Sequence, residues 1–387
     1  MNRFPLETCL ETRWELAARL FGAVATTPGR IPGPRLCNAA RQTRRLHHQP
    51  RNHPAWTLAV RPACYRKPLT QEPNNHRQYS TPPPAPNSNE PTIHSMFERH
   101  TSTWQYLVAD PSTHTAVIID PVLDYNNTNR TVSTHTADAL LSLIHSQGYA
   151  ISHILETHAH ADHLSAAFYL QRKLSPHKHQ GSGKPPLVGI GKRIGQVQRL
   201  FGKRYGVASE EHDGVFDLLL EDDAVLEVGR LRGQVMHLPG HTPDHVGYRI
   251  GDNVFCGDSL FHPSLGTARC DFPGGSAQAL YHSARKLLSL PDHVKIWTGH
   301  DYPVQGEREP EPWTSVGEHR ARNKHLRDGV TEDEFVELRS ERDRHLAAPR
   351  LVHESLQVNI RAGQLPKPDE AGMRTFKLPL KVQGGAW

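Results

Sequence analysis

The feature that most constrains this chain is a set of four short polar motifs, each of which directly follows an apolar run. The first motif places His158, His160, Asp162 and His163 within six residues, after the apolar run 151–155. Donors at strand ends, with a glycine beside each of the later motifs, predict loops that turn several side chains toward one point. The three later motifs are PGHTP at 239–243 with His241, CGDS at 256–259 with Asp258, and TGHDY at 298–302 with His300.

These residue types indicate a metal site. Imidazole and carboxylate donors together suit zinc, iron or manganese. The five cysteines, at 9, 37, 64, 256 and 270, contribute nothing to the first cluster, which argues against a structural thiolate site. One histidine among the 27 of the chain would be weak evidence, because most histidines are surface or capping residues. An ordered series of four strand-end motifs is much stronger evidence for one shared site.

Regular patterning starts near residue 94 and predicts a mixture of strands and helices. Helical spacing of apolar residues predicts helices at 136–148, from the first motif to 174, and at 192–201, 276–289 and 315–343. Two β-rich halves, each bordered by helices, indicate sheets packed face to face with the helices outside. Short apolar runs predict strands at 104–108, 116–120, 151–155, 187–190, 216–220, 224–228, 233–238, 246–250, 253–256 and 294–297.

The N-terminal part differs from the rest in its charge. Residues 1–77 hold 13 Lys and Arg against four acidic residues, so the rest of the chain is net acidic, with 32 against 36. An Arg-rich, acid-poor start with an amphipathic stretch at 14–21 is typical of a mitochondrial presequence, and RQYS at 77–80 resembles a presequence cleavage site. We therefore predict a location in the mitochondrial matrix; the alternatives are a disordered tail and a misassigned start codon.

The same contrast predicts the domain organisation. We expect a disordered basic leader at 1–79, a Pro-rich linker at 80–93, a catalytic domain at 94–345 and a C-terminal extension at 346–387 that packs on it. We expect no membrane insertion, because the chain has no uncharged apolar run of about 18 residues. We also expect no nucleic-acid partner, because the net charge of +5 belongs to the leader and the folded part has no basic aromatic stripe.

The four motifs resemble those of the metallo-β-lactamase superfamily. That resemblance implies an α/β fold, the αβ/βα sandwich of two mixed β-sheets flanked by helices, with the metal site at one edge. A finer resemblance is to the persulfide dioxygenases (sulfur dioxygenases), nearest to the bacterial β-lactamase-like hydrolases of sulfide-detoxification operons. It covers about residues 94–381 and rests also on DPV at 120–122, HLSAA at 163–167, GTARCDFPGG at 266–275, GEHRARN at 317–323 and QVNIRAG at 357–363.

The resemblance implies one non-haem Fe(II) per chain, held by His158, His241 and Asp258, with coordination positions left open for substrate and O2. The implied reaction oxidises glutathione persulfide with O2 to sulfite and glutathione, in mitochondrial sulfide detoxification. In hydrolase relatives one or two zinc ions occupy the site instead, and sequence spacing does not decide between the metals. Four further residues would surround the iron ligands or build a second metal site: His160, Asp162, His163 and His300.

Two candidate catalytic residues, Arg269 and Tyr302, lie on loops near these motifs. The planar guanidinium of Arg269 suits a substrate carboxylate or the emerging sulfite, and an internal salt bridge to Asp271 is the equally weighted alternative. Tyr302 is expected to hydrogen-bond near the metal, with packing alone as the alternative. Cys270 is a candidate redox-sensitive thiol, against the ordinary reading of a buried cysteine.

The main alternative function is a zinc-dependent thioester hydrolase of the glyoxalase II type, which shares the histidine motifs and also uses a glutathione substrate. The GTARCDFPGG loop and the tail after residue 300 favour the dioxygenase. A non-enzymatic sulfide-responsive protein and a nuclease of the same fold are weaker alternatives. The oligomeric state stays open, with a homodimer as the candidate assembly.

Overall fold

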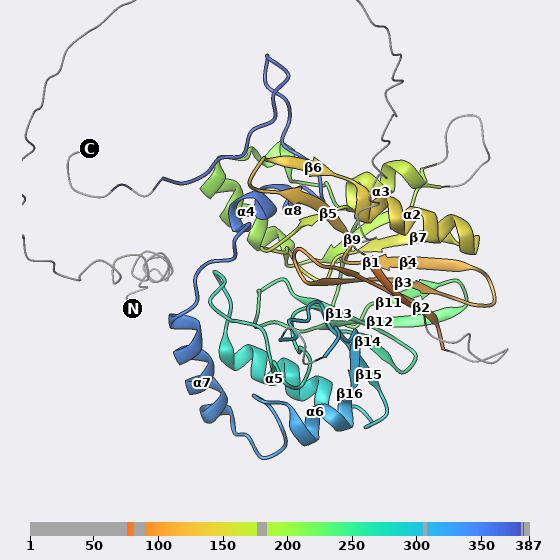
Figure 1. Ribbon diagram of the computed structural model, residues 1–387, viewed down its shortest axis with the longest axis vertical. Coiled ribbons are helices and arrows are strands. Elements are labelled where there is room, and N and C mark those ends of the chain that lie inside the picture. Colours follow the sequence, from red (N-terminus) through yellow and green to blue (C-terminus); the bar gives the residue numbers. More distant parts are fainter. Residues whose placement is uncertain (1–75, 81–89, 176–183, 305–307, 381, 383–387) are drawn as a thin grey trace, which may run out of the picture. The chain divides into compact units, whose positions relative to one another are not determined.

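The structure, a computed structural model, describes residues 76–80, 90–175, 184–304, 308–380 and 382. They belong to one compact unit, residues 74–387, in which two large sheets face each other and helices lie outside them (Figure 1). Most of the expected leader and linker therefore lies outside the described residues. Strand β1 (His76–Ser80) pairs with β2 (Thr92–Glu98), so regular structure spans the boundary that we expected between leader and linker.

The first sheet has seven strands in the order β1-β2-β3-β4-β7-β9-β10. Its strands pair antiparallel up to β4 and parallel from β4 onward, so the sheet is mixed. Central strand β3 is buried on both faces: Trp104 and Tyr106 contact the second sheet, and Leu107 contacts the helices. The remaining strands are β3 (Thr103–Ala109), β4 (Thr115–Ile119), β7 (Ala150–Leu155), β9 (Leu187–Gly191) and β10 (Leu218–Leu220).

The second sheet has six strands in the order β11-β12-β13-β14-β15-β16. Strands β14 and β15 are parallel neighbours, so their carboxyl ends lie at the same edge, where Asp258 and His300 follow them. The strands are β11 (Val225–Val228), β12 (Leu231–His237), β13 (Val246–Ile250), β14 (Asn253–Phe255), β15 (Lys295–Trp297) and β16 (Trp313–Ser315). A third, smaller sheet has the order β6-β5-β8 and contains β5 (Val122–Asn126), β6 (Thr131–Ser133) and β8 (Leu164–Ser165).

An aromatic core holds the two large sheets together. The ring centroids of Tyr106, Phe255 and Trp297 lie 5.1 to 5.7 Å apart, and all three side chains are buried. The Tyr106 hydroxyl donates to the Thr298 carbonyl at 2.5 Å, so this buried polar group is satisfied. Since Thr298 begins the loop that carries His300, the core also fixes the start of that loop.

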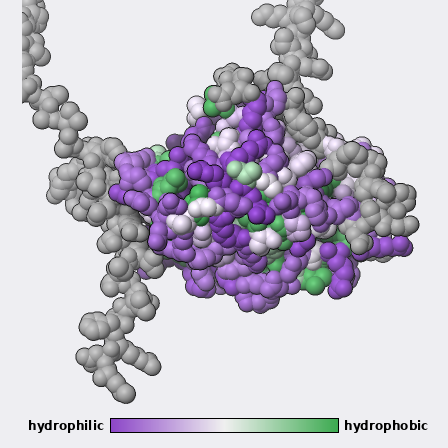
Figure 2. Space-filling view, turned by 90° about the horizontal axis from the view of Figure 1, so that it is seen from below, coloured by the Kyte–Doolittle hydropathy of each residue, from purple (hydrophilic) through white to green (hydrophobic). Residues whose placement is uncertain are grey.

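The helices divide between the outer faces of the two sheets (Figure 1). Helices α2 (His135–Gln147), α3 (Ala167–Leu174), α4 (Ile194–Tyr205) and α8 (Val352–Asn359) cover the first sheet. The other side has α5 (Ala277–Leu288), α6 (Val316–Arg322) and α7 (Glu332–Arg344). Seen from that side, the surface is mostly hydrophilic, with small separate groups of hydrophobic residues (Figure 2). The predicted architecture of two mixed sheets flanked by helices is confirmed.

One helical pattern that we expected to run through 315–343 is two helices. Helix α6 ends at Arg322 and α7 begins at Glu332. Gly329 has a φ of +93°, which an α-helix cannot contain, and Thr331 caps α7 in a capping box with Glu334. The apolar spacing continued across this break because both helices contribute to the same core.

The C-terminal extension contains α8, which packs against α4 and β8. This packing brings residues near the end of α8 next to the loop that follows β7. Among the described helices, none combines the length and the hydrophobicity that crossing a membrane requires.

Candidate metal centre

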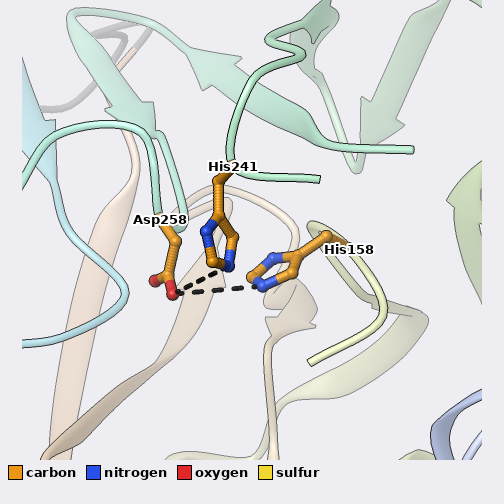
Figure 3. A group of neighbouring side chains, drawn as sticks. All are labelled: His158, His241 and Asp258. Atoms are coloured by element: carbon orange, nitrogen blue, oxygen red, sulfur yellow. Dashed lines mark ion pairs between the residues drawn. The ribbon is translucent and has the colours of Figure 1, made fainter. Parts of the chain in front are cut away.

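Three side chains from three strand ends point toward one another: His158, His241 and Asp258 (Figure 3). His158 follows β7, His241 follows β12, and Asp258 follows β14. The Asp258 Oδ2 atom lies 4.0 Å from His158 Nε2 and 3.7 Å from His241 Nε2. All three ligand atoms lie within 4.8 Å of one another, and all three residues are buried. The structure thus brings together the three residues that we expected to hold the metal.

Hydrogen bonds fix the tautomer of His158. The Thr157 hydroxyl donates to Asp120 Oδ2 at 2.9 Å, so its oxygen accepts from His158 Nδ1 at 2.9 Å. The Nε2 atom is left with its lone pair facing Asp258, and it has no hydrogen-bond partner among the described residues. Burial, and then the neighbouring imidazoles, hold the pKa of His158 well below its usual value. A neutral imidazole with a free Nε2 is the form that ligates a metal.

A backbone carbonyl orients His241 in the same way. His241 Nδ1 donates to the carbonyl oxygen of Arg269 at 2.8 Å, which turns Nε2 toward Asp258. The loop that supplies this carbonyl is itself held by α7. The Asp343 carboxylate accepts from the Cys270 amide at 2.8 Å, and Arg339 donates to the Thr267 carbonyl at 3.2 Å.

Asp258 is positioned by His245, a residue that we did not single out from the sequence. His245 Nε2 accepts from the Asp258 backbone amide at 3.0 Å. Its ring stacks on His158, with centroids 4.7 Å apart and planes at 22°. The sequence signal was a second histidine four residues after His241, in GHTPDH. Gly257 has a φ of +48°, and the close approach of Thr157 leaves no room for a Cβ atom there.

A second cluster lies beside the first one. His160, Asp162 and His163 offer ligand atoms within 4.8 Å of one another. His300 Nε2 lies 3.0 Å from Asp162 Oδ2 and 3.5 Å from Asp258 Oδ2, so it connects the two clusters. Burial disfavours the charged imidazole, but Asp258 and Asp162 outweigh it and raise the pKa of His300 to about 9. The four residues expected around the iron ligands are therefore also brought together.

His160 takes part in a third cluster, with Asp120 and Glu156. Its Nε2 atom lies 3.1 Å from Asp120 Oδ1 and 3.2 Å from Glu156 Oε2. Although burial disfavours the imidazolium, these carboxylates raise the pKa of His160 well above its usual value. Its Nδ1 atom is buried and has no hydrogen-bond partner among the described residues. The sequence motifs include Asp120, in DPV at 120–122, but not Glu156.

The residues present fit a bound metal ion. Buried polar atoms normally have hydrogen-bond partners. Here His158 Nε2, Asp258 Oδ1 and both ring nitrogens of His163 are buried without one among the described residues. These atoms converge on two adjacent donor sets of imidazole and carboxylate. An ion in these sets would satisfy the donors, with nitrogen and carboxylate oxygen ligands that suit iron or zinc.

The two candidate catalytic residues, Arg269 and Tyr302, make different contacts. The Arg269 guanidinium forms a bidentate pair with Asp271, at 2.5 and 2.6 Å, and also donates to the Ala347 carbonyl. The internal salt bridge is thus formed, and the contact of Arg269 with the centre runs through its backbone carbonyl. Tyr302 stacks on His300 with centroids 5.6 Å apart and planes at 11°, and it is 46% exposed.

The two described cysteines, Cys256 and Cys270, are both free and buried. Burial raises the pKa of Cys256 to about 12 and also raises that of Cys270. A buried thiol with a raised pKa is a weak nucleophile, which favours the ordinary reading of Cys270 as a core residue.

Comparisons with known proteins agree with this geometry. The profile of the Metallo-beta-lactamase superfamily matches residues 99–300, a range that contains every residue of the three clusters. A beta-lactamase hydrolase-like protein of Xylella fastidiosa is 43% identical over 299 residues, which cover 77% of this chain and 67% of that protein. Glyoxylase B2 of Dictyostelium discoideum is also 43% identical over 299 residues, 76% of this chain and 98% of that protein.

Persulfide dioxygenases are more distant relatives. The mitochondrial persulfide dioxygenase ETHE1 of Homo sapiens is 28% identical over 274 residues, which cover 70% of this chain and 88% of that protein. Among solved structures, ETHE1 from Myxococcus xanthus matches with a TM-score of 0.54 and 28% identity, over 70% of this chain and 99% of that chain. The sequence similarity of this chain therefore extends to proteins that carry different activities in their names.

Proposed function

Because this chain belongs to the metallo-β-lactamase superfamily, we propose that its metal centre is that of an iron-dependent persulfide dioxygenase. One Fe(II) per chain would be held by His158, His241 and Asp258. The observation that carries the proposal is the composition of this cluster. It joins two imidazoles and one carboxylate, which is the donor set of non-haem Fe(II) oxygenases. A third imidazole, that of His160, is not a member of this cluster and belongs to the two neighbouring clusters.

The proposed substrates are glutathione persulfide and O2. In the balanced reaction, one persulfide, one O2 and one water give one thiol and one sulfite with two protons; the S–S bond breaks and the terminal sulfur is oxidised. Iron, when bound, supplies the redox chemistry and open coordination positions for the sulfur and for O2. The chain's own residues orient the donors. The Thr157 hydroxyl and the Arg269 carbonyl direct the two Nε2 atoms, and His245 holds Asp258.

Two further parts of the proposal concern location and substrate contact. We propose the mitochondrial matrix, supported by the Arg-rich, acid-poor start of the sequence and by the mitochondrial persulfide dioxygenases among the relatives. Arg269 and Tyr302 remain proposed substrate contacts. A substrate carboxylate would have to share the Arg269 guanidinium with Asp271.

A zinc-dependent thioester hydrolase of the glyoxalase II type is the second candidate. Two observations favour it. The second cluster provides donors for a second ion, with Asp258 placed between His241 and His300 at 3.7 and 3.5 Å. In addition, a relative with 43% identity is named Glyoxylase B2. The two candidates differ in the number of ions, in the metal and in whether O2 is consumed.

The first test measures metal and reaction together on the full chain. We expect anaerobically purified protein to hold one iron per chain and to consume O2 with glutathione persulfide, forming sulfite. Elemental analysis, an oxygen electrode and sulfite detection measure these quantities. A protein that holds zinc, consumes no O2 after iron loading and hydrolyses S-lactoylglutathione would be the hydrolase instead.

The second test is Asp162→Asn, which removes a carboxylate of the second cluster and keeps its shape. In a one-iron enzyme, Asp162 only orients its neighbours. We therefore expect one iron per chain to remain and O2 uptake to fall by no more than about 10–100-fold. In a two-zinc enzyme the metal content would fall from two ions to one. Elemental analysis of the variant beside the unmodified protein separates these outcomes.

A further inference from the structure

We infer that Asn359, near the end of the C-terminal helix α8, is a positioning residue that holds the metal-ligand loop 158–163 in its binding conformation. Its carboxamide nitrogen donates to the backbone carbonyls of His160 and His163, both at 2.8 Å. Its carboxamide oxygen accepts from the Ser165 amide, also at 2.8 Å. One side chain thus joins three backbone groups of the segment that carries four of the candidate donors.

The loop needs such a partner because of its own geometry. Between β7 and β8, the side chains of His158, His160 and His163 converge on the metal clusters and are buried. The carbonyls of His160 and His163 accept from the buried Asn359 side chain, so they lie where water is excluded. A buried carbonyl without a donor is unfavourable, so a loop left to itself would turn toward solvent and move its imidazoles.

Only a primary carboxamide of the right length meets this need. Asparagine offers two N–H donors and one acceptor, whereas aspartate offers no donor and serine offers one. Asn359 is 4% exposed, and the packing of α8 against β8 fixes the direction from which it approaches. Gly363, just beyond α8, lies so close to the loop that a Cβ atom there would meet the Ser165 carbonyl at 2.9 Å. The C-terminal extension therefore supports the metal-ligand loop through contacts to its backbone, whichever metal the loop holds.

The chain offers a closely matched control two residues earlier. Gln357 is 2% exposed, lies on the same helix and makes the same kinds of bonds. Its carboxamide nitrogen donates to the carbonyls of His353 and Lys377, at 2.7 and 3.0 Å, and its oxygen accepts from the Lys377 amide at 3.0 Å. These partners belong to α8 and to the C-terminal tail. Replacing Gln357 therefore removes an equal set of bonds without touching the metal-ligand loop.

The experiment compares Asn359→Ala with Gln357→Ala. Fe(II) affinity is measured anaerobically at fixed pH by competition with a chromogenic chelator, and melting temperatures are measured for the metal-free proteins. We expect Asn359→Ala to bind Fe(II) about 10–100-fold more weakly, the effect typical of a lost partner of metal ligands, and Gln357→Ala to stay within about threefold of the unmodified chain. Equal affinity of Asn359→Ala and the unmodified chain would overturn the inference. So would an equal loss in both variants, because that would reflect a general weakening of α8.

A second measurement uses the unmodified chain and so does not depend on how the variants fold. Coupling between two sites is reciprocal: if α8 orders the loop for the metal, the metal must in turn stabilise α8. We expect Fe(II) to slow hydrogen exchange of the backbone amides at 352–360, and to slow it in the metal-ligand loop. Slower exchange in the loop with no change in α8 would show that the two are not coupled and would overturn the inference. Neither measurement depends on which reaction the centre catalyses.

Discussion

Replacing His241 with alanine is expected to abolish metal retention and activity. The candidate iron set has only three protein donors, and His241 is one of its two imidazoles. With one donor gone, His158 and Asp258 still face each other at 4.0 Å but can form only two bonds to an ion. We expect the iron content of the purified variant to fall below about a tenth of that of the unmodified chain, because a partial ligand set binds divalent metals far more weakly.

Persulfide-dependent O2 uptake is expected to fall with the metal. A metal ion contributes several kcal/mol to the stabilisation of the transition state, and about 1.4 kcal/mol corresponds to tenfold in rate, so we expect a loss of at least about 10³-fold. The control is His293→Ala, since His293 is an exposed histidine that pairs with Asp252 at 3.1 Å and lies in none of the metal clusters. A His241→Ala protein with full iron content and O2 uptake would exclude His241 as a ligand.

The candidate metal donors themselves were predictable because they are local in sequence. Each follows an apolar run, and His158 and Asp258 indeed follow strands β7 and β14. The strand expected at 246–250 is β13 (Val246–Ile250), without a shift. A strand fixes where its next residue goes, so polar donors at four strand ends of two facing sheets could be expected to meet.

The residues that orient the donors were much harder to predict, because their contacts join distant parts of the chain. Asn359 contacts a carbonyl 199 residues away, and nothing near it in sequence identifies that partner. The carbonyl that orients His241 belongs to the backbone of Arg269, and any residue type provides a carbonyl. The sequence suggests a role for the guanidinium of Arg269. In the structure, it is the backbone carbonyl of that residue that contacts the candidate ligand His241.

Gly299 lies so close to the Asp258 carboxylate that a side chain at this position would not fit. Replacing Gly299 with alanine is expected to displace Asp258, although no donor is removed. A Cβ atom at this position would lie 2.3 Å from Asp258 Oδ1, closer than nonbonded atoms can approach. The backbone at Gly299 cannot easily move away, because its amide donates to the Gly257 carbonyl at 2.9 Å and its carbonyl accepts from the Trp104 amide at 2.8 Å. The Asp258 carboxylate must therefore leave its present position beside the imidazoles of His158 and His241.

Misplacement of a reacting group by about 1 Å can lower a rate about 10²-fold, so we expect Gly299→Ala to reduce kcat/KM by about that factor and to weaken Fe(II) binding. The backbone of Gly299 does not have a positive φ, so alanine adds no backbone strain and the methyl group alone is tested. The matched control is Gly195→Ala in α4, where the new methyl group would meet only the end of the Arg199 side chain at 3.4 Å. That control should keep full activity and gain up to about 1 kcal/mol of stability. If Gly299→Ala keeps its full iron content and an unchanged kcat/KM, the position that Asp258 occupies beside Gly299 is not needed for metal binding.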